Sequence, residues 1–129
     1  MNEPRWLTRE IVIVLHGELI AEHGGASGLR DEGALESALA RPQQKHHYEP
    51  GDIVGLAATY AFGLCSNHPF VDGNKRVALA SLDVFLRING WELAATEVDA
   101  VTAILELASG QLSEDALVEW VRKNAAKLG

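Results

Sequence analysis

The sequence predicts an all-α protein, a compact bundle of about six helices. Along most of the chain apolar residues recur three or four positions apart, which is the spacing of one helix face. Residues that cap helices stand before several of these stretches, and glycine or proline follows several of them. Apolar residues make up 47% of the 129 residues, and no linker, repeat or low-complexity tract divides them. We therefore predict one domain with one core over residues 1–129.

The first helix is expected between Thr8 and about His23. The Thr8 hydroxyl can accept a hydrogen bond from the first turn, and the pair Gly24-Gly25 can end the helix. The apolar stripe of this helix consists of Ile11, Leu15, Leu19 and Ile20.

A shorter helix should follow over residues 32–41. Asp31 can cap it, and Pro42 should stop it, because a proline inside a helix removes one hydrogen bond and crowds the preceding turn. The stretch after this helix, residues 42–51, is polar and contains a second proline. It predicts a loop or a short hairpin.

Two central helices should form most of the core. Residues 52–68 are almost all apolar or small for about four turns, as in a helix that is buried on most sides. The second central helix should begin at about Lys75 and continue to Ile88, with Gly90 just past its end.

The C-terminal part predicts a short extended piece at residues 91–95 and two last helices. Thr96 and Ser113 are good caps for these helices, and the first of them should end near Ser109-Gly110.

Charge and cysteine content narrow the class of protein. The formal net charge is −7 and there is no run of lysine or arginine, which argues against direct nucleic-acid binding. No apolar run approaches the roughly 20 residues of a membrane-spanning helix, and the N-terminus lacks the apolar segment of a signal peptide. The single cysteine, Cys65, cannot form an internal disulfide. These features predict a cytoplasmic protein with no membrane partner.

The stretch HPFVDGNKR, residues 68–76, carries polar residues between the two central helices. Gly73-Asn74 predicts a turn, and the helix after it exposes unpaired N–H groups that suit a phosphate. Lys75 and Arg76 stand at the positive end of that helix, where an anion would offset their charge. Asn74 can donate through its amide, and Gly73 lets the backbone approach an anion closely.

Two further side chains would complete a site for phosphoryl transfer. Asp72 offers a hard oxygen for Mg²⁺, the usual companion of a nucleotide phosphate. His68 can accept a proton near neutral pH. A plain turn with solvated cations explains the same residues. A DNA-recognition helix headed by Lys75 and Arg76 is less consistent, because apolar residues follow them and the net charge is negative.

This stretch resembles the signature of the Fic/Doc family, His-Pro-Phe-x-[Asp/Glu]-Gly-Asn-Gly-Arg, which lies in a loop between two helices of an all-helical core. The matching residues are His68, Pro69, Phe70, Asp72, Gly73, Asn74 and Arg76. Lys75 replaces the glycine of the AMP-transferring members and is typical of the Doc (death on curing) branch. Leu79 stands where many of those members carry an arginine, and residues 28–43 resemble the upstream block of Doc-like toxins.

The resemblance implies a role for each signature residue. His68 would be the general base that takes a proton from the target hydroxyl, and Asp72 would hold Mg²⁺ on the nucleotide. Arg76 would stabilise the charge of the transferred group, and Phe70 would point inward and anchor the loop. The residues that would bind the nucleotide phosphates are Gly73, Asn74, Lys75 and Arg76.

Within the family, the residue at the position of Lys75 distinguishes transfer of AMP from transfer of a phosphate group, according to the resemblance. A glycine leaves room for an α-phosphate, and AMP is transferred. A lysine fills that space, and in the Doc branch it accompanies a reversed nucleotide whose γ-phosphate faces the acceptor. The resemblance therefore implies an ATP- and Mg²⁺-dependent kinase toxin that phosphorylates a hydroxyl side chain of a protein and halts translation. The expected target is translation elongation factor Tu, and AMP transfer is the alternative.

No stretch of the chain fits the inhibitory helix that many Fic enzymes carry, so an inhibitor in trans is expected. The resemblance points to a small Phd-type antitoxin of a type II toxin-antitoxin system. A non-catalytic Fic-like protein that only binds an antitoxin or a nucleotide is a second alternative, although every expected catalytic position is filled.

The polar stretch 42–51 has two possible roles. It can act like the substrate-positioning flap of the family, in which case Lys45, His46 and His47 would contact the target. A solvated loop explains the same residues equally well.

Overall fold

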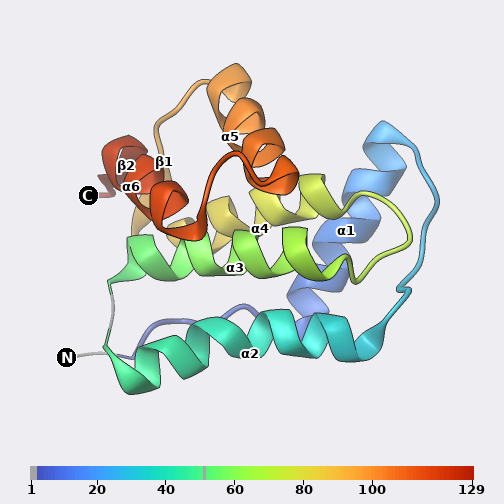
Figure 1. Ribbon diagram of the computed structural model, residues 1–129, viewed down its shortest axis with the longest axis horizontal. Coiled ribbons are helices and arrows are strands. Elements are labelled where there is room, and N and C mark those ends of the chain that lie inside the picture. Colours follow the sequence, from blue (N-terminus) through green and yellow to red (C-terminus); the bar gives the residue numbers. More distant parts are fainter. Residues whose placement is uncertain (1–2, 51) are drawn as a thin grey trace.

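The computed structural model describes residues 3–50 and 52–129, which form six helices and one two-stranded sheet (Figure 1). The helices are α1 (Arg9–His23), α2 (Glu32–Tyr48), α3 (Ile53–Asn67), α4 (Asn74–Ile88), α5 (Glu97–Ser109) and α6 (Glu114–Asn124). The strands β1 (Trp91–Leu93) and β2 (Ala125–Lys127) pair antiparallel, with Trp91 opposite Lys127. The predicted all-α fold class is confirmed. Within the described residues no helix is both long and apolar enough to cross a bilayer.

Helix α3 forms the centre of the bundle, as Figure 1 shows, and most of its residues are buried. Its Tyr60 ring is fully buried and lies 4.9 Å, between centroids, from the ring of Phe85 on α4. At Gly63, a Cβ atom would lie only 3.3 Å from the Cα of Ala38. Glycine at this position therefore allows α2 and α3 to pack closely, as the sequence indicated.

The predicted helix starts are confirmed by their capping hydrogen bonds. The backbone N–H groups of Ile11 and Ala34 donate to the side chains of Thr8 and Asp31, at 3.2 and 3.0 Å. The same arrangement recurs at Thr96 and Ser113, each at 3.1 Å. Each cap satisfies a donor that the helix itself cannot pair, which is why these local signals were reliable.

Helix α1 ends at Gly24, as predicted, but its buried face differs from the predicted stripe. Gly24 adopts a positive φ of 83°. The buried residues of α1 are Val12 and His16, whereas the predicted Ile11, Leu15 and Leu19 pack against the core while partly exposed.

The prediction that Pro42 ends the second helix was wrong. Helix α2 continues to Tyr48, and Pro42 is buried inside it. Contacts made beyond Pro42 stabilise the continuation: the Lys45 Nζ donates to the Thr59 hydroxyl of α3 at 3.3 Å, and the His46 ring lies 5.6 Å, between centroids, from the Trp6 ring. Packing thus outweighs the lost helical hydrogen bond. The predicted loop at 42–51 is helical over residues 42–48, and Gly51 lies outside the described residues.

Burial also predicts how stability changes in alkali. It raises the pKa of Tyr60 to about 12 and that of the Cys65 thiol to about 11, since both groups are removed from water. The folded protein holds these protons to higher pH than the unfolded chain, in which tyrosine has a pKa of about 10 and cysteine about 8.5. The free energy of unfolding should therefore be constant at neutral pH and fall as pH rises toward 12.

Thermal unfolding between pH 7 and 12 measures this effect. We expect a weaker alkaline decrease of Tm in Tyr60→Phe than in wild type. The Phe variant also loses the hydrogen bond from the Leu7 N–H (3.0 Å), so its Tm at pH 7 should be lower. Tyr48→Phe is the control, because Tyr48 is 89% exposed. Equal alkaline slopes in all three proteins would contradict the prediction.

Candidate active site

Residues 68–73 join α3 to α4 at one end of the bundle (Figure 1), and the turn begins at His68. His68 caps the C-terminus of α3 with a left-handed φ of 47°, and among the described residues it is the only non-glycine with a positive φ. Arg30 supports this turn from the segment before α2. Its Nε donates to the His68 carbonyl at 3.1 Å, and its Nη2 donates to the Asn67 carbonyl at 3.4 Å. The His68 side chain itself is exposed.

The middle of the loop is held by Phe70, which is 1% exposed. Its ring stacks on the imidazole of His16, with centroids 3.8 Å apart and planes 9° apart. The Asn74 side chain bonds both backbone groups of Phe70: Oδ1 accepts from the N–H at 2.9 Å and Nδ2 donates to the carbonyl at 3.0 Å. The inward position predicted for Phe70 is confirmed. The structure gives the Asn74 amide a role in closing the loop, and phosphate binding by Asn74 stays a prediction.

The end of the loop carries Asp72 and Gly73. The Asp72 carbonyl lies 2.7 Å from Nε2 of His16. The Asp72 carboxylate accepts from the Gly73 N–H at 2.8 Å and from the Ala26 N–H at 3.3 Å. Gly73 then begins α4 with a left-handed φ of 78°, and no side chain caps the first N–H groups of α4.

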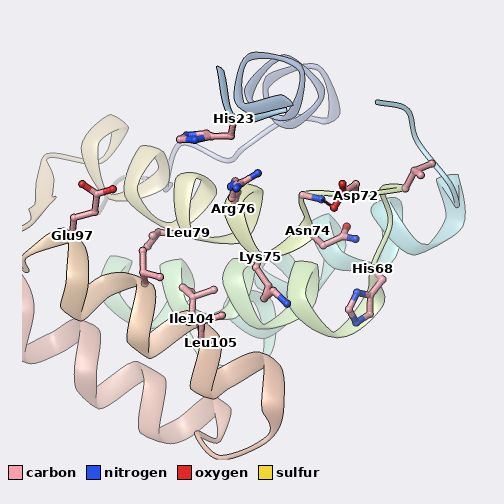
Figure 2. A pocket seen from close by; sticks show the side chains of 13 residues that line it. His23, His68, Asp72, Asn74, Lys75, Arg76, Leu79, Glu97, Ile104 and Leu105 are labelled. Atoms are coloured by element: carbon pink, nitrogen blue, oxygen red, sulfur yellow. Dashed lines mark hydrogen bonds between the residues drawn. The ribbon is translucent and has the colours of Figure 1, made fainter. Parts of the chain in front are cut away.

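A cleft of about 680 Å³ lies between this loop and α5 (Figure 2). It is lined by all six signature residues predicted for the site, namely His68, Asp72, Gly73, Asn74, Lys75 and Arg76. In the view of Figure 2, Lys75 extends on the side of His68, whereas Arg76 extends on the side of His23, at the end of α1. Leu79 lies one turn after Lys75 and faces the same cleft.

The cleft is built to receive an anion. Lys75 and Arg76 are exposed in the first turn of α4, which contains no acidic residue. Among the described residues neither cation forms an ion pair. Two cations, an uncapped helix N-terminus and the helix dipole therefore all favour negative charge at one place.

The chemistry of Asp72 fits a magnesium ion that arrives with a nucleotide. Its carboxylate is exposed at the cleft wall, and each oxygen accepts one backbone N–H, which leaves further lone pairs free. Mg²⁺ is usually bound by one or two carboxylates together with substrate phosphates and water. One carboxylate beside a helix N-terminus that favours negative charge is compatible with that pattern.

Comparison with known proteins agrees with this geometry. Residues 6–86, well over half of the chain, match the model of the Fic/DOC family. The chain belongs to the Fic/DOC family. It is 32% identical to Protein kinase doc of Escherichia phage P1 over 120 residues. This alignment covers 92% of this chain and 94% of the relative. It is 38% identical to Toxin Doc of Mycolicibacterium smegmatis over 98 residues, and this alignment covers 73% of this chain and 75% of that relative.

Both relatives carry the name Doc, so the predicted Doc branch of the Fic/DOC family is confirmed. The feature that pointed to this branch, Lys75 in place of the signature glycine, lies in the cleft.

The residues predicted to act as a substrate-positioning flap lie away from the cleft. Lys45, His46 and His47 belong to the last turns of α2 and do not line the cleft. Figure 1 shows that this end of α2 and the α3–α4 loop are at opposite ends of the bundle. The Lys45 Nζ donates to the Thr59 hydroxyl at 3.3 Å, and positive charge at a helix C-terminus is favourable. The predicted loop conformation is thus corrected to helix, and contact with a target stays a prediction.

Sequence reasoning missed the residues that surround the signature loop. These include His16 and Arg30, and the far wall of the cleft, formed by residues of α5 such as Ile104 and Leu105. His16 carried one available signal, because a histidine interrupts the apolar face of the predicted first helix. Arg30 lies in the block 28–43 that resembles Doc-like toxins, but that resemblance did not place it against the loop, and the α5 wall carried no signal. Only the tertiary fold brings both to the loop.

Proposed function

We propose that this Doc-branch protein is the toxin of a type II toxin-antitoxin system and acts as a protein kinase. It would transfer the γ-phosphate of ATP to a hydroxyl side chain of a protein. The observation that carries the proposal is Lys75, which occupies the signature glycine position at the uncapped N-terminus of α4 and lines the cleft. One of the two relatives is named a protein kinase and the other a toxin, which supports both parts of the proposal.

His68 would start the reaction as the general base. Its imidazole would take the proton of the target hydroxyl, whose oxygen then bonds to the γ-phosphorus of ATP. The bond from that phosphorus to the bridging oxygen breaks, and ADP leaves with the electron pair. His68 is exposed at the edge of the cleft, where the side chain of a protein substrate can reach it.

The N-terminus of α4 would stabilise the charge of the transferred group. Lys75 and Arg76 line the cleft from the first turn of α4, and no side chain caps the backbone N–H groups after Gly73. Positioned cations and N–H groups supply most of the catalysis in phosphoryl transfer. Mg²⁺, when bound, neutralises phosphate charge, and Asp72 is the residue that would hold it.

The identity of the partners extends the same proposal. Translation elongation factor Tu is the proposed target, and its phosphorylation in the cytoplasm would halt translation. A Phd-type antitoxin is the proposed inhibitor. The relative named Toxin Doc is consistent with a partner of this kind.

Intact-mass spectrometry tests the proposed reaction. Purified protein is incubated with elongation factor Tu, ATP and Mg²⁺, beside a His68→Ala control and a reaction without Mg²⁺. We expect the target to gain the mass of one phosphate group with the wild-type protein and Mg²⁺ only. A gain of one AMP group would show that Lys75 does not reverse the nucleotide. An unchanged target in all samples would refute phosphorylation of elongation factor Tu.

A further inference from the structure

We propose that His16 of α1 is a positioning residue for the active site. It would hold the Asp72 end of the signature loop, so that the carboxylate for Mg²⁺ and the N-terminus of α4 are preformed before the nucleotide binds. The kinetic consequence rests on the kinase function proposed above, whereas the effect on the loop does not.

His16 is buried, and two contacts fix its ring. The side chain is 4% exposed, and its Nε2 lies 2.7 Å from the Asp72 carbonyl oxygen. Because a carbonyl oxygen only accepts, Nε2 must carry the proton and donate it. The ring also stacks on Phe70 at 3.8 Å. The stack fixes the plane of the imidazole, and the hydrogen bond fixes its rotation within that plane.

Through these contacts His16 supports two parts of the site, the Asp72 carboxylate and the N-terminus of α4. The hydrogen bond acts on the backbone of Asp72, whose carboxylate is oriented by the N–H groups of Gly73 and Ala26. A Cβ at Gly73 would lie 3.5 Å from Nε2 of His16, so the imidazole also packs against the residue that begins α4. His16 does not line the cleft, so it would act through Asp72 and Gly73 and not on the substrate.

Local hydrogen exchange in the free protein separates positioning from plain core packing. His16→Phe keeps an aromatic ring for the stack and removes the donor, whereas His16→Gln keeps a donor near the position of Nε2. Val12→Ala is the matched control, since Val12 is fully buried one turn earlier in α1. We expect the amides of Gly73 and Val77, which bond within this loop end, to exchange about tenfold faster in His16→Phe. Amides of α3 should exchange at the wild-type rate.

Steady-state kinetics supply the second readout. In His16→Phe the loop would be ordered only when Mg·ATP binds, and part of the binding free energy would be used to order it. The KM for Mg·ATP should therefore rise about tenfold, while kcat stays within about twofold of the wild-type value. His16→Gln should return both readouts toward wild type, and Val12→Ala should change Tm only. If His16→Phe does not fold, His16→Met, which is flexible and has no donor, takes its place.

Two results would overturn the proposal. One is a lower Tm in His16→Phe with loop exchange no faster than in Val12→Ala. The other is a His16→Gln variant as impaired as His16→Phe in both loop exchange and KM. If the wild-type protein transfers no phosphate to any tested target, the kinase function fails, and the hydrogen-exchange comparison still decides the role of His16.

Discussion

The His68→Ala variant is expected to transfer phosphate to its target about 10²- to 10⁴-fold more slowly than wild type, the usual range for loss of a general base. The fold should survive, because the His68 side chain is exposed and its hydrogen bonds are made by its backbone. Nucleotide binding should also survive, since the cations of the cleft belong to α4. We therefore expect kcat to fall while the KM for ATP stays near the wild-type value.

A second substitution separates chemistry from backbone strain. Alanine tolerates the left-handed conformation of His68 (φ 47°) less well than histidine does, so His68→Ala should also lower Tm slightly. Asparagine tolerates this conformation and has no basic nitrogen. His68→Asn should thus keep the wild-type Tm and lose activity to the same extent. An active His68→Asn protein would show that His68 is not the base.

Phe70→Ala is expected to give the largest loss of stability, about 3–5 kcal/mol of unfolding free energy. The Phe70 ring is almost completely buried and stacks on His16, so its removal leaves a cavity behind the signature loop. The backbone of Phe70 would keep its hydrogen bonds to Asn74, which limits how far the loop can collapse into that cavity. Urea unfolding followed by circular dichroism measures the loss.

Phe62→Ala controls for the removal of an aromatic ring elsewhere on the bundle. Phe62 is only partly buried, beneath the guanidinium of Arg41 on α2. Its loss should cost clearly less unfolding free energy and leave nucleotide affinity unchanged, whereas Phe70→Ala should lower both. Equal losses of stability in the two variants would contradict the anchoring role of Phe70.

The sequence by itself determined the features that depend on neighbouring residues. Thr8, Asp31, Thr96 and Ser113 begin helices where they were expected, because a cap needs only a hydroxyl or carboxylate and the first turn after it. The six signature residues predicted for the site share one cleft for the same reason: they lie within nine consecutive positions, at the end of one helix and the start of the next.

Only the tertiary structure decided the features that depend on residues far apart in the chain. Helix α2 continues through Pro42 because residues beyond the proline contact α3 and Trp6. Strand β2 follows α6 directly because β1, more than thirty residues earlier, offers it a partner. His16 and Arg30 bond to the signature loop across 56 and 38 residues of the sequence. Such contacts form only when the chain collapses into one fold, and no local pattern of residues records them.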